Sequence, residues 1–160
     1  MRIEERLQEL GLDLPPAPQP PPGVIVPFKW VRIHDNRAYV AGHGPQIADG
    51  SFAGPFGKVG LEVSPEQAYT AARLATLSIL GNLKRALGDL DRISAWLMVS
   101  GHVAVAPGFN RTTNVINGCS DLLLEVFGSE IGAHARTAIG VAELPLGSPV
   151  VIAAEVAIRL

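Results

Sequence analysis

The C-terminal stretch of the chain, residues 134–160, constrains the fold more than any other segment. It contains two apolar strands joined by a turn rich in proline and glycine, residues 144–149. One face of the second strand carries Val150, Ile152, Ala154, Val156 and Ile158, and the other carries Val151, Ala153, Glu155 and Ala157. A strand with one solvated face alternates apolar and polar residues, and this one does not. We therefore predict that both faces are covered, in part by a neighbouring subunit.

The first of these strands carries one fixed charge, Arg136, near its start. A guanidinium stays charged and offers a rigid fork of donors that suits a carboxylate. Two interpretations follow for Arg136. It binds a carboxylate ligand, or it forms a structural ion pair with Glu130, Glu143 or Glu155, as many buried charges do.

Composition excludes several classes of protein. The 160 residues suit one domain, with 48% hydrophobic and 18% charged residues. A net charge of −2 and a pI of about 6.1 argue against a nucleic-acid partner, which requires a basic face. The single cysteine, Cys119, excludes an internal disulfide and fits a reducing compartment. Without a signal-peptide pattern or a membrane-length apolar run, a cytoplasmic location is expected.

Hydrophobic periodicity predicts the remaining elements. A short amphipathic helix over residues 2–10 precedes a proline-rich spacer at 15–22, so we divide the chain into 1–23 and a single domain at 24–160. Strands are predicted at 24–34, 37–42 and 93–105, and helices at 65–87 and 109–127. Ala68, Ala72, Ala75, Ile79, Leu83 and Ala86 form the predicted inner stripe of the long helix.

This order of elements predicts an α+β fold, with both long helices on one face of a mixed sheet. The opposite sheet face would then be apolar and uncovered within one chain. Exposed apolar patches of that size are typical of interfaces. We therefore predict a homo-oligomer, before any family comparison.

The residues that could carry chemistry are few. None of the four histidines has metal-binding spacing with another ligand, so no metal site is expected. His43, at a glycine-rich strand end, is the candidate general acid or base, and its alternative role is a hydrogen bond to backbone. Cys119 lies on an apolar helix stripe, as an inert core thiol would. The glycine-rich loop at 54–60 does not lead from a strand into a helix, so neither nucleotide binding nor another cofactor is expected.

Several motifs resemble the Rid (YjgF) family. Residues 135–138 (ARTA) and 141–147 (VAELPLG) resemble its C-terminal signature, and 40–45 (VAGHGP) resembles its strand-end loop. Residues 115–122 (VINGCSDL) resemble a segment of its longer members. The resemblance implies a chorismate-mutase-like, ferredoxin-like fold and a homotrimer with sites between subunits. It also implies hydrolysis of imine or enamine intermediates from amino-acid metabolism, although some members are called endoribonucleases or translation inhibitors.

The resemblance assigns site residues one by one. Arg136 matches the arginine that holds the substrate carboxylate, and Gly42 matches the glycine that offers backbone at the strand end. Phe28 stands where active deaminases have tyrosine, Ala41 where serine is common, and Ala138 where cysteine is common. The resemblance thus implies a site that keeps its carboxylate-binding part and loses hydroxyl groups.

The glutamate that positions the attacking water in the family falls at Val151. Glu155 lies on the same face of the strand but about 13 Å further along it, too far to substitute. Asn117 is a further candidate for lining the site. Three functions remain open: a weak or divergent imine deaminase, a trimeric non-catalytic binder or sensor of a small carboxylate, and a ribonuclease. The acidic pI and the lack of a histidine pair disfavour the ribonuclease.

Overall fold

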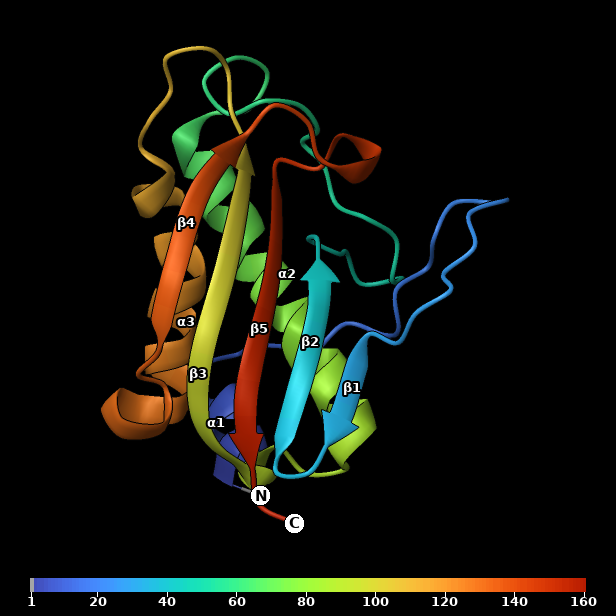
Figure 1. The fold of residues 1–160 in the computed structure, drawn as a ribbon, viewed down its shortest axis with the longest axis vertical. Coiled ribbons are helices and arrows are strands. Elements are labelled where there is room, and N and C mark those ends of the chain that lie inside the picture. The colour runs from blue at the N-terminus through green and yellow to red at the C-terminus, as the bar shows by residue number, and fades with distance from the viewer. Residues whose placement is uncertain (1) are drawn as a thin grey trace.

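A computed structural model describes residues 2–160, which form one mixed sheet with two long helices behind it (Figure 1). The elements in chain order are α1 (Arg2–Glu9), β1 (Val31–His34), β2 (Arg37–His43), α2 (Pro65–Leu87), η1 (Leu90–Arg92), β3 (Ile93–Ala104), α3 (Thr112–Ile131), β4 (Ala135–Val141), η2 (Pro145–Gly147) and β5 (Val150–Ile158). The sheet has five strands in the order β1-β2-β5-β3-β4. Only β3 and β4 pair in parallel, so the predicted α+β class and mixed sheet are confirmed.

The sequence signals of α2 define its ends. Ser64 caps the helix and exchanges hydrogen bonds with Gln67, Pro65 occupies the first turn, and Gly88 ends the helix at a φ of 81°. Ala68, Ala72 and Ala75 are fully buried, which lets the helix lie close to its neighbours. Placing Ala86 on the inner stripe was wrong, because the buried face passes through Leu87 and leaves Ala86 exposed.

Helix α3 packs against α2 so closely that Gly118 has no room for a side chain beside the Tyr69 carbonyl oxygen. The five predicted inward residues of α3, which are Ile116, Cys119, Leu123, Val126 and Phe127, are all buried. The predicted stop at Gly128 is confirmed for the regular helix, which is interrupted there before a short helical segment follows. Gly128 has a φ of 81° and a ψ of 176°, which bends the segment, and helical structure continues to Ile131.

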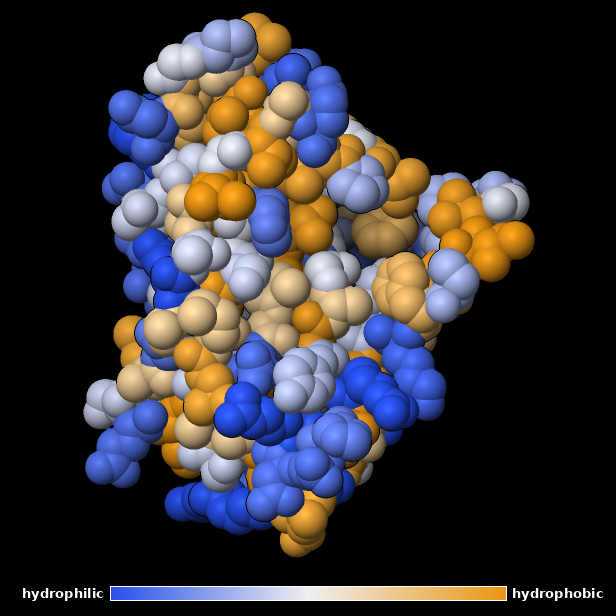
Figure 2. Space-filling model, in the orientation of Figure 1, coloured by the Kyte–Doolittle hydropathy of each residue, from blue (hydrophilic) through white to orange (hydrophobic). Residues whose placement is uncertain are grey.

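The first predicted strand was too long at its start, because β1 begins only at Val31. Pro27 lacks the N–H that a ladder needs, and strand-like pairing on this side begins with the Ala41 N–H bond to the Trp30 carbonyl at 2.9 Å. Residues 20–28 instead form an arm that projects from the body, at the right of Figure 1. Its tip is apolar in Figure 2, and Ile25 is 85% exposed.

The N-terminal helix and spacer are bound to the body of the chain. Helix α1 buries Leu7 and packs on η1 and α3. The spacer is held by the Arg85 guanidinium on the Pro15 carbonyl at 3.0 Å and by the Gln46 amide on the Pro16 carbonyl at 3.1 Å. The first residues of the spacer are therefore fixed to the body of the chain, and its last residues pass into the arm.

Among residues 2–160, no helix covers the second face of the sheet, and we call it the open sheet face. Val151, Ala153 and Ala157 on β5 are only partly buried there, and Tyr39, Met98 and Ile139 expose 43%, 39% and 49% of their surface. Figure 2 views this face and shows mainly apolar colours over its middle, with charged groups gathered towards the bottom. The prediction of an uncovered apolar face in the single chain is confirmed.

Candidate functional site

An apolar cavity of about 290 Å³ lies where β2 ends and β5 begins. Its wall combines the arm, the loop after β2, the turn before β5 and the strand ends themselves. The lining residues are Pro20, Val24, Ile25, Val26, Phe28, Trp30, Gly42, Gly44, Phe52, Phe56, Pro145, Leu146, Ser148 and Val151. None of these side chains is charged at neutral pH, so the cavity supplies shape and apolar contact rather than electrostatic attraction.

Gly42 and Val151 meet at the floor of this cavity. A Cβ atom built on Gly42 would lie 2.7 Å from Val151 Cγ1, so a methyl group of Val151 packs directly on the Gly42 backbone. The register shift between Val40 and His43 on β2 produces this approach. Phe28 is 53% exposed and meets Trp30 edge-on, with 5.1 Å between ring centroids. Of the residues predicted from the motifs, Phe28, Gly42 and Val151 therefore line one cavity.

Arg136 lies elsewhere, on β4 opposite Val99, with β5 and β3 between it and β2. Its guanidinium donates to the Ser120 hydroxyl at 2.9 Å and to the Thr113 carbonyl at 3.1 Å, both on α3. Within residues 2–160, no carboxylate forms an ion pair with Arg136. The remaining guanidinium N–H groups are donors that a ligand carboxylate could use.

The alternative interpretation, in which Arg136 forms a structural ion pair, was wrong. Two of the three proposed partners form ion pairs with other residues. Glu143 pairs with Lys58 at 3.2 Å, and Glu155 pairs with Arg37. Glu130 forms no ion pair with Arg136 in the part of the chain described. Within one chain, however, Arg136 does not line the apolar cavity, so a single chain does not unite it with Phe28 and Gly42.

Asn117 and Ala41 also lie apart from the cavity lining. Asn117 lines a polar hollow between the N-terminal ends of α2 and α3, together with Tyr69 and Asp121. Ala41 is half-buried, and its carbonyl oxygen accepts a hydrogen bond from His43 Nδ1 at 2.6 Å. Neither side chain reaches the cavity floor in one chain.

His43 is the centre of a buried polar chain that sequence reasoning missed. Its Nδ1 bonds the Ala41 carbonyl, and its Nε2 lies 2.8 Å from Asn82 Nδ2. The Asn82 carbonyl oxygen in turn accepts from Arg85 Nε at 3.1 Å and Nη2 at 2.7 Å. The sequence signal was Asn82, a polar residue directly before Leu83 of the predicted inner stripe of α2.

The environment of His43 leaves it unsuited to proton transfer with a ligand. Burial, opposed by the bond to the Ala41 carbonyl and assisted by the nearby Arg85 charge, lowers the His43 pKa to about 4. The ring is neutral at pH 7 and both nitrogens are engaged. The alternative role considered for His43, a histidine bonded to backbone, matches this geometry.

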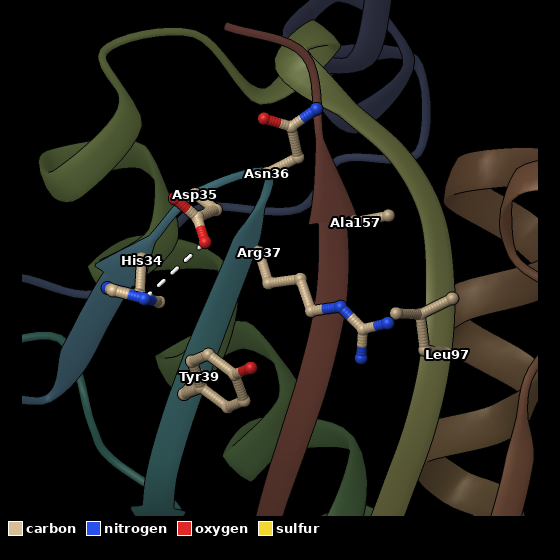
Figure 3. A pocket seen from close by; sticks show the side chains of 7 residues that line it. All are labelled: His34, Asp35, Asn36, Arg37, Tyr39, Leu97 and Ala157. Carbon is tan, nitrogen blue, oxygen red and sulfur yellow. Dashed lines mark ion pairs between the residues drawn. The ribbon is translucent and has the colours of Figure 1, made fainter.

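Glu155 is held by an ion pair on β5, four residues beyond Val151. It pairs with Arg37, whose side chain stretches across β5 towards Leu97 on β3 (Figure 3). Arg37 and Leu97 line an open hollow of about 640 Å³ at the hairpin end of the open sheet face, beside the His34–Asp35 pair at 3.4 Å. Glu155 is thereby engaged at the far end of its strand.

One acidic cluster has carboxylate oxygens close enough to hold a metal ion. Glu4, Asp89 and Asp91 bring theirs within 4.8 Å of one another. Lys84 Nζ already lies 2.6 Å from a Glu4 oxygen, and the Arg2 and Ile3 N–H groups donate to Asp91. These contacts attach α1 to η1 and α2, so the cluster has a structural role.

Comparison with known proteins decides the family. The family model described as "YjgF/chorismate_mutase-like, putative endoribonuclease" matches residues 4–156. The chain belongs to the YjgF family. Protein TCP17 of Trypanosoma cruzi, a relative of this chain, is 36% identical over 155 residues, which cover 97% of this chain and 93% of TCP17.

Solved structures agree with the YjgF assignment. The Atu1372 protein of Agrobacterium tumefaciens is 38% identical, with a TM-score of 0.85 over 99% of this chain and 92% of that one. A protein of Shewanella oneidensis MR-1, whose name carries the endoribonuclease label, is 29% identical, with a TM-score of 0.89 over 98% of this chain and 99% of that one. The resemblance found in the motifs is therefore confirmed, including the chorismate-mutase-like fold. Within residues 2–160, no helix has the length and apolarity to cross a membrane.

Proposed function

We propose that this YjgF protein binds a small carboxylate and is at most a weak imine deaminase. The observation that carries the proposal is Val151, which packs on Gly42 where the family resemblance places a glutamate. Imine hydrolysis needs water delivered to the imine carbon and a proton moved to the leaving ammonia. Valine can do neither, and an apolar cavity tends to stay dry. Retained binding with lost proton transfer favours affinity over rate.

The proposal includes a homotrimer, in which sites form between subunits. The apolar cavity and Arg136 lie on different parts of one chain, so a complete site needs Arg136 from a second copy. The open sheet face offers the apolar surface through which copies would associate. Cys119 is buried, and burial raises the pKa of its thiol to about 11, which suits an unreactive thiol in a reducing, cytoplasmic setting.

Replacing Ala153 with glutamate is expected to convert the trimer to monomer. Ala153 lies in the middle of the open sheet face, where a buried unpaired carboxylate would be costly. Sedimentation velocity at micromolar concentration measures the change. Ala86→Glu is the matched control, because Ala86 is exposed on α2. A wild-type chain that sediments as a stable monomer would contradict the trimer.

Replacing Arg136 with alanine is expected to abolish the thermal stabilisation produced by a carboxylate ligand. At a ligand concentration of about a hundred times Kd, the wild-type chain gains about 2.7 kcal/mol. A thermal-shift screen of keto acids, amino acids and aromatic carboxylates measures it. Arg73→Ala, which removes an ion pair with Glu125 on the helical side, is the control for general destabilisation. Equal ligand shifts in wild type and Arg136→Ala would show that Arg136 is not the carboxylate site.

The ribonuclease hypothesis has the least support. RNA binding draws on basic grooves, and this chain has a net charge of −2. Its best-placed histidine, His43, is buried and neutral. The word endoribonuclease in the names of relatives therefore does not by itself support ribonuclease activity in this chain.

A further inference from the structure

We infer that the ligand of this site is a carboxylate with a bulky apolar side chain, either aromatic or branched aliphatic. The inference rests on the proposed function and names the ligand class for the same site. It comes from the chemistry of the cavity wall, from its size and from the lack of cationic side chains among the residues that line it.

The wall of the cavity selects apolar groups. Four aromatic side chains, those of Phe28, Trp30, Phe52 and Phe56, are among its lining residues, and most of the others are apolar. The Ser148 hydroxyl donates its proton to the Val150 carbonyl at 2.7 Å, so it offers no donor to a ligand. A polar side chain would lose its hydrogen bonds to water on entering this wall, and that loss opposes binding.

The size of the cavity favours a ring or a branched chain. An apolar cavity of roughly 150 Å³ is enough to bind benzene. The volume of about 290 Å³ next to Val151 has room for a six-membered ring with its attached carbons. A two- or three-carbon acid would leave most of the space unfilled and would bury little apolar area.

The charge distribution fixes the direction of the ligand. Among the described residues, none that lines the cavity is cationic, so a carboxylate placed inside it would be buried without an ion-pair partner from the same chain. The apolar body therefore occupies the cavity and the carboxylate faces its mouth. The mouth is bordered by Phe28 and Phe56, which are 53% and 49% exposed. In the proposed trimer, a carboxylate at this mouth would meet Arg136 of another copy.

Four ligands separate the side-chain effect from the head-group effect: acetate, phenylacetate, acetamide and phenylacetamide. Titration calorimetry on the full chain should show phenylacetate binding about ten- to a hundredfold more tightly than acetate, because the ring buries apolar surface. Phe56→Ser should weaken phenylacetate and leave acetate unchanged. Leu61→Ser is the matched control, since Leu61 is 72% exposed and lies outside the cavity lining.

The two proposals fail in different ways. Equal affinity for acetate and phenylacetate, or no binding of phenylacetate at millimolar concentration, would overturn the inference about the side chain. If phenylacetamide binds as well as phenylacetate and Arg136→Ala changes neither, the ring-binding cavity stands but the carboxylate function is overturned. Retained preference for the ring in Phe56→Ser and in a second variant, Leu146→Ser, would show that the ring binds elsewhere.

Discussion

Replacing Val151 with glutamate is expected to raise the rate of imine hydrolysis by about 10²- to 10⁴-fold, the usual contribution of a positioned acid or base. Val151 Cγ1 already lies in the space directly over Gly42, so a longer side chain from the same Cα reaches the cavity floor. A coupled assay that generates the imine in situ and follows its loss measures the effect. The wild-type chain is expected to be slow in the same assay.

The apolar wall should assist the introduced carboxylate. Desolvation favours the neutral acid, so the pKa of a carboxyl group in this cavity should rise above its usual value of about 4.3. A base with a pKa closer to neutral pH is a more effective proton acceptor. The rate of the Val151→Glu variant should therefore increase with pH through a midpoint above about 5, while the wild-type profile lacks that step.

Val151→Gln separates proton transfer from simple polarity. Glutamine has almost the same shape as glutamate but accepts no proton, so it should leave the rate near that of wild type. Adding Phe28→Tyr to Val151→Glu restores one of the missing hydroxyl groups and should raise the rate further. Wild-type activity equal to that of Val151→Glu, or equal rates for the Glu and Gln variants, would show that this site performs catalysis by other residues.

Local signals predicted the regular elements well, and they failed where chain connectivity at long range decides. The caps at Ser64 and Gly88 gave α2 its bounds because they act within a few residues of the helix ends. Residues 24–28 of the arm looked like the start of a strand because they are largely apolar. The exposure of the arm depends on Pro27 and on the lack of a partner strand. Pro27 can be read from the sequence, but the lack of a partner strand cannot.

The candidate site shows the same division. Phe28, Gly42 and Val151 were found through motifs, and they do share one cavity. The contacts of Asn82 with His43 and of Arg85 with Pro15 join residues that are 39 and 70 positions apart, so no local sequence pattern predicts these contacts. In the proposed trimer, the relation between Arg136 and the cavity would depend on how copies assemble, which residue spacing within one chain does not encode.

Acid is expected to destabilise this chain through His43 before its carboxylates contribute. The His43 pKa is about 4 in the folded chain, against an ordinary value of 6.5 for a solvated histidine. Between these values the unfolded chain binds a proton that the folded chain excludes, so stability falls as pH falls. The contribution of neutral His43 to the free energy of unfolding is complete above about pH 6.5. Below that pH it decreases by about 1.4 kcal/mol per pH unit, so that about 3 kcal/mol is lost by pH 4. Urea unfolding at several pH values measures it.

A pair of matched variants assigns this loss to His43. His43→Asn removes the titrating group and should flatten the slope between pH 6.5 and 4, although it lowers stability at pH 7 by breaking the bond with Asn82. His34→Asn changes an exposed histidine and should keep the wild-type slope. Hydrogen bonds from Ser51 lower the pKa of Asp49. Burial raises the pKa of Asp91, but hydrogen bonds, among them those from the Arg2 and Ile3 N–H groups, outweigh it and lower this pKa to about 2. Their contributions are therefore lost only at lower pH. If the pH dependence of stability persists in His43→Asn, the acid sensitivity does not come from the hydrogen-bond network of His43, Asn82 and Arg85.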